Sequence, residues 1–266
     1  MSKVRVGVSG AAGRMGRRLV SLISSDVDLE LGLALESSFC DYLGVDVGEL
    51  CGVGGLGVKL CSEFSGGIDV LIDFSSPQAL EGVVRGCVDF GVPLVYATTG
   101  ATPEQLRLIE SASHSVAVLT SPSMSLMVNL AMTLCQSAAK TLAHKAGKDV
   151  DVEIVESHHR YKKDSPSGTA LKFGRIISEE MGLDVQTFGR EGQVGERKRN
   201  EIGFHSIRIG DDPGAHSILF GLLGETLEIS VKATSRDCYA IGAIAAAKFI
   251  RDKPAGMYNM NDLLFG

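Results

Sequence analysis

Short apolar runs alternate with helical patterns through the first half of the chain, and this alternation restricts the fold more than any other feature. One helix is expected to follow Gly16 and to end near residue 23, and a second is expected over 78–90. A third is expected to begin at Thr102, a cap residue that precedes a proline. The apolar runs are continuous, as in strands buried on both faces, and lie at 4–9, 29–35, 70–74, 92–97 and 115–119. Strands and helices that alternate over short connections predict an α/β domain with a Rossmann-like, doubly wound parallel sheet.

The pattern changes after residue 121. Long helices are expected over 123–142 and 169–181, a strand over 151–157, and loops with short strands over 37–67. Gly-rich turns separate later strands at 202–209, 216–222 and 227–233, which predicts a smaller α+β domain with a mostly antiparallel or mixed sheet. An apolar helix at 239–250 is expected to pack back on the first domain. The predicted division is a first domain (1–125), a second domain (126–236), and a return to the first domain (237–266).

Charge and cysteine usage exclude several classes of function. The 266-residue chain has a formal net charge of −6 and no basic block, so nucleic acid and anionic membranes are not expected as partners. No apolar run reaches the ~20 residues of a membrane-spanning helix, and the N-terminus leads directly into a strand, so no signal peptide is expected. The six cysteines form no CxxC pair, which favours a reduced, cytoplasmic protein without a metal site.

A glycine-rich turn follows the first strand and leads into a helix, with the sequence Gly10-Ala11-Ala12-Gly13-Arg14-Met15-Gly16. Such a turn lets backbone amides approach a pyrophosphate, and the helix N-terminus favours the anion. The spacing is G-x-x-G-x-x-G and differs from the familiar G-x-G-x-x-G because Ala12 stands where a glycine is usual. The alternative is a tight strand-to-helix turn that binds nothing.

Glu36 ends the second strand, 20 residues after Gly16, where an acid commonly binds the adenosine ribose hydroxyls. This position supports a nicotinamide dinucleotide as cofactor. Ser37 follows, so the second strand offers no cation for a 2′-phosphate. NADH is therefore slightly favoured over NADPH, and the cations that could compensate are Arg14, Arg17 and Arg18.

Two polar segments follow the ends of later strands. They are Thr98-Thr99-Gly100 and Ser121-Pro122-Ser123-Met124. In an open α/β sheet these strand ends line the crevice where a nicotinamide lies. Ordinary turn chemistry explains either segment equally well when it is taken alone.

The densest group of reactive side chains lies in residues 156–170. His158 and His159 follow a strand directly, and successive side chains of an extended chain point to opposite sides, so the two imidazoles are expected to have different roles. Arg160 and Lys162 lie next to them and suit an anionic substrate. Ser167-Gly168-Thr169 opens a helix whose amides can bind a carboxylate, although a plain helix cap is the alternative and both can hold.

Several segments spread along the chain match the motifs of one enzyme family. They include the Gly-Arg-Met-Gly loop at 13–16, Asp-Phe-Ser-Ser-Pro at 73–77, Thr-Thr-Gly at 98–100, and Glu-Ser-His-His-Arg-Tyr-Lys-Lys-Asp-Ser-Pro-Ser-Gly-Thr-Ala at 156–170. Shorter matches are Arg190-Glu191-Gly192, Gly195-Glu196-Arg197, Ile202-Gly203-Phe204 and Ser235-Arg236. On these motifs the chain closely resembles the 4-hydroxy-tetrahydrodipicolinate reductase (dihydrodipicolinate reductase) family of lysine and diaminopimelate biosynthesis.

The resemblance implies an NAD(P)H-dependent reduction of a small dicarboxylate, with a role for each matching residue. It makes His158 the general acid and Lys162 its catalytic partner. It places His159, Gly168 and Thr169 on the substrate carboxylates. The implied cofactor contacts are Gly10, Ala11, Ala12, Gly13, Arg14, Met15, Glu36, Ala97, Thr98, Thr99, Ser121, Pro122, Ser123 and Met124. Family members are usually homotetramers joined through the sheets of the second domain. The resemblance thus makes 1–125 the dinucleotide-binding domain, to which 237–266 returns, and 126–236 the substrate and oligomerisation domain.

The chain departs from the family pattern in three places. Tyr161 stands where some relatives have a further histidine, Ser123-Met124 replaces the usual Asn-Phe, and Ser37 replaces a frequent arginine. Two rival functions are considered. One is another nicotinamide enzyme of similar build, such as an amino-acid or sugar dehydrogenase, against which residues 158–162 argue. The other is a non-catalytic nucleotide sensor, which should have lost His158 or Lys162.

Overall fold

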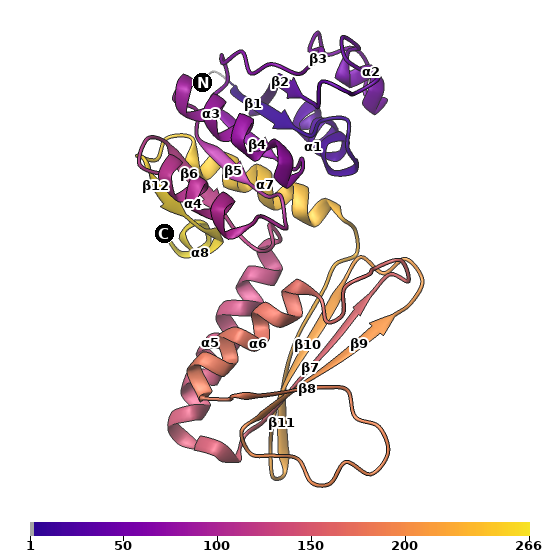
Figure 1. Cartoon of the computed structure of the whole chain (residues 1–266), viewed down its shortest axis with the longest axis vertical. Helices are drawn as coiled ribbons and strands as arrows, with labels where there is room; N and C mark the ends of the chain where they lie inside the picture. The colour runs from indigo at the N-terminus through magenta and orange to yellow at the C-terminus, as the bar shows by residue number, and fades with distance from the viewer. Residues whose placement is uncertain (1–2) are drawn as a thin grey trace. The chain divides into compact units, whose positions relative to one another are not determined.

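The computed structural model describes residues 3–266 and divides into two compact units (Figure 1). Unit 1 comprises the chain up to Leu126 together with Asp237–Gly266, and unit 2 is Met127–Arg236. The first two residues of the expected first domain lie outside the described residues. Within the described part of the chain, no helix is both long and apolar enough to cross a membrane.

Unit 1 contains a seven-stranded sheet in which all the pairings are parallel. The order is β12-β6-β5-β4-β1-β2-β3, so the chain runs outward in both directions from β1 and β4. This confirms the predicted doubly wound sheet, whose switch point is where such folds bind ligands. The strands are β1 (Val4–Ser9), β2 (Leu29–Leu35), β3 (Leu60–Cys61), β4 (Val70–Asp73), β5 (Leu94–Tyr96), β6 (Ala117–Thr120) and β12 (Gly256–Tyr258).

Two separate apolar cores cover the two faces of this sheet. One joins α1 (Arg14–Ser25) and α7 (Asp237–Ile250) to the strands, with Leu19 and Ala243 buried against Val6. The other joins α3 (Leu80–Phe90) and α4 (Pro103–Ala112) to the opposite face, with Leu80 and Ile109 buried. Thr102 caps α4 in a capping box with Gln105, as its sequence indicates. The remaining short elements are η1 (Pro77–Ala79), α2 (Val47–Cys51) and α8 (Met260–Phe265).

Unit 2 is a mixed five-stranded sheet in the order β11-β10-β7-β9-β8. β10 pairs antiparallel with β11 and β7, whereas β7 and β8 pair parallel with β9. Helices α5 and α6 bury a core of apolar residues against one face, which we call the inner face (Figure 1). The elements are α5 (Leu126–Lys145), η2 (Gly147–Asp149), β7 (Asp151–His158), α6 (Gly168–Met181), β8 (Val185–Phe188), β9 (Glu201–Arg208), β10 (Ala215–Leu222) and β11 (Glu225–Lys232).

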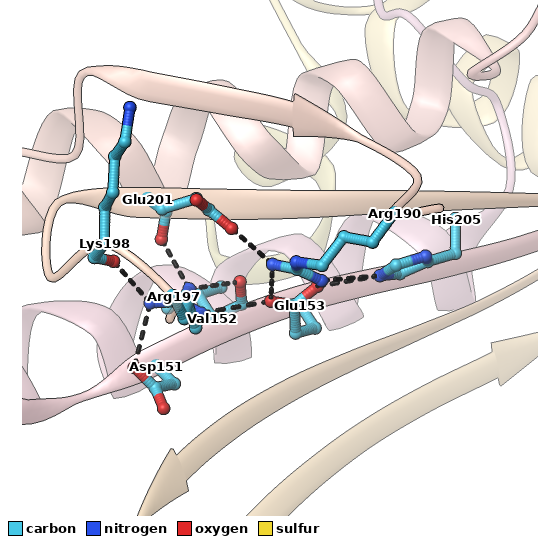
Figure 2. Close-up of polar contacts among 8 residues, drawn as sticks. All are labelled: Asp151, Val152, Glu153, Arg190, Arg197, Lys198, Glu201 and His205. Atoms are coloured by element: carbon cyan, nitrogen blue, oxygen red, sulfur yellow. Dashed lines mark hydrogen bonds and ion pairs between the residues drawn. The ribbon is translucent and has the colours of Figure 1, made fainter. Parts of the chain in front are cut away.

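A cluster of ion pairs lies on the opposite, outer face of the unit 2 sheet (Figure 2). We call it the Glu153 cluster, and it consists of Asp151, Glu153, Arg190, Arg197, Glu201 and His205. Arg190 and Arg197 donate to Glu153 at 2.7 and 3.1 Å, and they hold the segment between β8 and β9 against β7. Burial raises the pKa of Glu153, but hydrogen bonds from Arg190, His205 and Arg197 outweigh it and lower the pKa to about 2.

Several expected element boundaries were wrong. The long helix begins at Leu126, not 123. The strand expected over 92–97 is only Leu94–Tyr96, since it follows Pro93, which has no N–H to donate. Strands β8 and β12 and helix α8 were missed because four residues of strand, three of strand and six of helix carry too little periodic pattern.

Candidate active site

The turn between β1 and α1 is built for close backbone approach. Gly10 has φ of +77°, a conformation that favours glycine, and the N–H groups of Gly10 and Ala11 both donate to the Leu35 carbonyl. A Cβ on Gly16 would lie 2.1 Å from the Gly10 carbonyl oxygen, so α1 can approach the turn only without a side chain there. Gly13, the N-cap of α1, supplies no side-chain acceptor, which leaves the helix N-terminus available to an anion.

Glu36 ties the end of β2 to this turn. Its Oε1 accepts from the Ala12 N–H at 2.9 Å, and its Oε2 accepts from the Ser37 N–H at 3.1 Å. The carboxylate therefore has a structural role in shaping the loop. Its remaining lone pairs can still accept from ribose hydroxyls, so both roles are compatible.

A cavity of about 750 Å³ opens beside this turn. Of the predicted cofactor residues, Gly10, Gly13 and Glu36 line it. Sequence reasoning missed the rest of the wall, which comes from the end of β2, the loop after β3, the loop after β4 and one face of α3. The missed residues include Ser62, Glu63, Phe64, Phe74, Ser75, Ser76, Gln78, Gly82, Arg85 and Asp89, whereas Ser37, which also lines the cavity, had been noted after Glu36. The helical spacing of the α3 residues could be seen in the sequence. That their face lines a cavity depends on how the loop after β3 packs opposite them.

Asp73 joins two of the strand ends at this edge of the sheet. It is fully buried at the end of β4, and its carboxylate accepts from Ser75 Oγ and Thr98 Oγ1, each at 2.6 Å. Burial raises the pKa of Asp73, and the hydrogen bonds from Ser75, Thr98 and Ser9 oppose this increase. The loops after β4 and β5 are therefore held together by one buried acid.

The other predicted cofactor residues lie at the carboxyl ends of β5 and β6 or at the start of α1. Ala97 is buried and donates its N–H to the Asp73 carbonyl, whereas Thr99 and Pro122 are exposed. Ser123 and Met124 are buried. Arg14 is exposed on α1. Because β5 and β6 run parallel to β1, these segments reach the same edge of the sheet as the glycine turn.

The inner face of the unit 2 sheet changes from apolar to polar along its strands. Val152 and Ile154 of β7 belong to the core, but Glu156 and His158 continue the same face. The β7–β9 register pairs His158 with Arg208, and the β7–β10 register pairs Glu156 with His216. Three strands thus bring four polar residues together at one end of an otherwise apolar face.

His158 is held by a buried carboxylate. Its Nδ1 lies 2.5 Å from Oε2 of Glu156, which is 1% exposed. Arg208 donates to both oxygens of that carboxylate, at 3.0 and 2.7 Å. Burial raises the pKa of Glu156, but the bonds from Arg208, Ser206 and His158 lower it to about 2. Burial lowers the pKa of His158, Lys162 and Arg208 lower it further, and Glu156 partly offsets them.

The start of α6 is attached to the same group. Ser167 Oγ caps the helix by accepting from the Ala170 N–H at 3.1 Å, and it lies 3.1 Å from His216 Nε2. The Ser167 N–H donates to Glu156 Oε1 at 3.3 Å. Gly168 is exposed and Thr169 half-buried in the first turn of the helix, where amides can bind an anion.

The turn between β7 and α6 carries the remaining predicted residues. Lys162 lies 3.0 Å from Asp164, so in this structure its charge is paired. His159 has an Nδ1 atom that is buried with no hydrogen-bond partner among the described residues, and its ring contacts Tyr161. An orphaned buried nitrogen is costly unless a ligand satisfies it, which suits a binding role. Arg160 is exposed, and its backbone N–H donates to the Gly210 carbonyl at 3.1 Å.

The arrangement provides two chemical capabilities, one in each unit. Unit 1 has a glycine turn, a free helix N-terminus and a cavity suited to a dinucleotide. Unit 2 has an imidazole held by a carboxylate, a nearby ammonium and a helix start suited to a carboxylate. Sequence reasoning missed Arg208 and His216, which lie about fifty residues after His158 and have no local motif.

Comparisons with known proteins cover nearly the whole chain. The family description "Dihydrodipicolinate reductase, N-terminus" matches residues 4–124, and "Dihydrodipicolinate reductase, C-terminus" matches residues 127–264. The 4-hydroxy-tetrahydrodipicolinate reductase of Rhodopirellula baltica is 46% identical over 97% of this chain and 94% of its own. That of Alkalilimnicola ehrlichii is 40% identical over 98% of each chain. A solved dihydrodipicolinate reductase from Paenisporosarcina sp. TG-14, with dipicolinate bound, has a TM-score of 0.73 over 97% of this chain and 99% of its own, at 23% identity.

Proposed function

The chain belongs to the dihydrodipicolinate reductase family, and we propose how its residues carry out the reaction of that family. The reaction reduces 4-hydroxy-tetrahydrodipicolinate to tetrahydrodipicolinate in lysine and diaminopimelate biosynthesis, with a nicotinamide cofactor as reductant. The match over both halves of the chain is the observation that carries this function. The assignment of each residue to a step is our proposal.

Unit 1 would hold the cofactor. The open N-terminus of α1 and the turn over Gly10–Met15 suit its pyrophosphate, and Glu36 suits its ribose hydroxyls. The other predicted contacts, Ala97–Thr99 and Ser121–Met124, would lie along the nicotinamide. When bound, the cofactor supplies a hydride to C4 of the unsaturated substrate ring. The chain's own contribution is to position the two reactants, which can supply much of the rate.

The charges around the cavity favour NADH over NADPH. Glu36 and Glu63 both line it, and either carboxylate would repel a 2′-phosphate. Arg18 is paired with Asp237, which neutralises its charge, and Arg17 already donates its Nε–H to the Ala12 carbonyl. Among the described residues that line the cavity, the one cation is Arg85. It is the candidate contact for any use of NADPH.

Unit 2 would hold the substrate and supply the proton. Hydride addition at C4 leaves an enamine, and His158 donates a proton to the ring carbon that completes the reduction. Lys162 is a compact cation on the same turn as His159. It would exchange its ion pair with Asp164 for one with a substrate carboxylate. The N–H groups of Gly168 and Thr169, at the start of α6, and the unpartnered Nδ1 of His159 would bind the carboxylates.

The cellular setting follows from the same family. We propose a cytoplasmic homotetramer joined through the sheets of the unit 2 domain. A mildly acidic chain with a buried, anion-directed site suits a small dicarboxylate better than nucleic acid or a membrane surface. The rival function of a non-catalytic sensor is disfavoured because His158 and Lys162 are both present.

The decisive experiment measures NADH oxidation with the freshly made product of the preceding synthase. The purified chain is expected to oxidise NADH only when that product is present, and NADPH more slowly. The same assay is run with a set of amino acids and sugars, which are the substrates of the rival dehydrogenases. Turnover of one of those substrates, with none of the synthase product, would overturn the proposed function.

A further inference from the structure

We propose that Glu156 is a positioning residue for this reaction, which fixes the proton of His158 on Nδ1 and places Ser167 at the start of α6. The inference rests on the proposed function, since it concerns the group that donates the proton. Glu156 was part of the motif seen in the sequence, but no role followed from the residues alone. Its contacts in the structure supply one.

The contact with Glu156 fixes the tautomer of His158. A neutral imidazole carries a proton on one nitrogen and accepts at the other. The Nδ1 of His158 lies 2.5 Å from a carboxylate oxygen of Glu156, and an ionised carboxylate can only accept. The proton must therefore be on Nδ1. Nε2 is then the nitrogen that takes up a proton from solvent and passes it to the substrate.

Arg208 allows the carboxylate of Glu156 to stay charged inside the protein. A buried carboxylate is costly unless it is paired and its lone pairs are satisfied. Arg208 binds both oxygens of Glu156 in a forked arrangement and donates also to the Asp164 carbonyl at 2.7 Å. The same guanidinium therefore links the carboxylate to the turn that carries Lys162.

Glu156 is also connected to the start of α6, where the substrate is proposed to bind. Oε1 of Glu156 accepts from the Ser167 N–H, while Oε2 accepts from His158. Ser167 in turn caps α6 next to Gly168 and Thr169. One carboxylate thus fixes the distance between the proton donor and the proposed carboxylate-binding amides. Errors of about 1 Å in such a distance can cost 10²-fold in rate.

Glu153 provides a matched control on the same strand. It lies three residues earlier, on the outer face of β7, and it is also held by arginines, as Figure 2 shows. Its pKa is also lowered to about 2. Its partners are Arg190, Arg197 and His205, none of which touches His158 among the described contacts. Substitution at either position removes a carboxylate of β7 that is bound by arginine. Only substitution of Glu156 also removes a contact with the proposed proton donor, His158.

The experiment compares Glu156→Gln with Glu153→Gln in the complete protein. Glu156→Gln is expected to lower kcat about 10²-fold, within the 10²–10⁴-fold that a positioned proton donor supplies, and to leave the KM for NADH unchanged. It should also move the alkaline fall of kcat/KM to lower pH, because the anion that favours protonated His158 is gone. Glu153→Gln should keep kcat within about twofold and leave the pH profile in place.

Equal losses of kcat in both variants, with unmoved pH profiles, would show a merely structural role and overturn the proposal. A normal kcat in Glu156→Gln would do the same. If that variant does not fold, ¹⁵N NMR of the wild-type histidines decides, with His158→Gln for assignment, at a pH where the His158 ring is neutral. The single proton of the neutral ring must be found on Nδ1, and a neutral ring with its proton on Nε2 refutes the proposal. This measurement needs no turnover, so it stays separate from a failure of the proposed function.

Discussion

The Nδ1 atom of His158 lies 2.5 Å from Oε2 of Glu156, and the two residues are neighbours on the inner face of β7. The carboxylate of Glu156 raises the pKa of the imidazole. Burial, which has the largest effect, and the charges of Lys162 and Arg208 lower it. The balance leaves the pKa of His158 below its ordinary value in the free protein. The proposed proton donor therefore holds its proton less readily in the free protein than an ordinary histidine does, and a bound anionic substrate favours protonation.

This balance predicts different pH profiles for kcat/KM and kcat. The protonated fraction of His158 falls as pH rises, so kcat/KM, which reports the free protein, is expected to fall above a pKa lower than that of an ordinary histidine. A bound dicarboxylate adds negative charge nearby and raises the pKa of His158, so the fall in kcat should come at higher pH. Initial rates between pH 5 and pH 9, with His158→Gln as control, test this; coincident profiles would contradict it.

Gly214 lies against the other side of the same imidazole. It has φ of +141°, and a Cβ there would lie 2.9 Å from His158 Nε2. Gly214→Ala is expected to displace the ring from its present position against Glu156 and lower kcat about 10-fold or more. Gly224→Ala is the control, since Gly224 also has positive φ but a Cβ there meets nothing within 4 Å. Both variants share the backbone strain, so equal kcat values would show that the contact with His158 is unimportant.

The sequence could predict the segment that carries His158 but not the residues that surround it. Glu156–Ala170 was recognisable because a histidine pair, cations and a helix start are adjacent in the chain. Arg208 and His216 come from β9 and β10, and only strand register places them beside Glu156 and His158. Register depends on the packing of the whole sheet, which no single-sequence pattern reports.

The sheet of unit 1 shows the same limit. Its parallel strands were predictable because each is a continuous apolar run buried on both faces. The cavity beside the glycine turn was only partly predictable, since the wall that contains Glu63 and Arg85 is formed by the loop after β3 and by α3. The segment 37–67 has weak periodicity, so nothing in it indicated that it would face α3. Gly86 is close-packed there: a Cβ would lie 2.4 Å from the Phe64 ring.

Asp73 is expected to control cofactor binding through Thr98 and Ser75. Asp73→Ala would leave both hydroxyls without their buried acceptor, which costs about 1–3 kcal/mol of folding free energy for such a group. The loops after β4 and β5 should loosen, so the KM for NADH should rise more than kcat falls. Asp73→Asn keeps one acceptor oxygen and should have a smaller effect. Equal KM values for wild type and Asp73→Ala would refute this role, provided that urea unfolding shows both to be folded.

Ser37→Arg is expected to change the choice of cofactor. The new guanidinium would extend from the end of β2 into the cavity, where it can pair with a 2′-phosphate beside Glu36. The ratio of kcat/KM for NADPH over that for NADH should rise about 10-fold, the change that roughly 1.4 kcal/mol of extra binding produces. Ser37→Ala separates loss of the hydroxyl from gain of the cation. An unchanged ratio would show that β2 does not control the preference.

The Glu153 cluster predicts how stability depends on pH. The pKa of Glu153 is about 2 in the folded protein, below its ordinary value of 4.5. A lowered pKa means that the stabilisation is present above pH 4.5 and is lost as pH falls toward 2, by at most about 3 kcal/mol for this group. Glu153→Gln should therefore be less stable at neutral pH and lose less stability on acidification.

Urea unfolding at fixed protein concentration, between pH 7 and pH 3, measures this effect. The curve for Glu153→Gln should be flatter than that of wild type but not flat, because the pKa of Glu156 is also about 2 and its contribution remains. Glu179→Gln, which removes an exposed carboxylate on α6, away from the strands, is the control and should follow the wild-type curve. Parallel curves for wild type and Glu153→Gln would mean that Arg190 and Arg197 bind this carboxylate without adding net stability, as some ion pairs do.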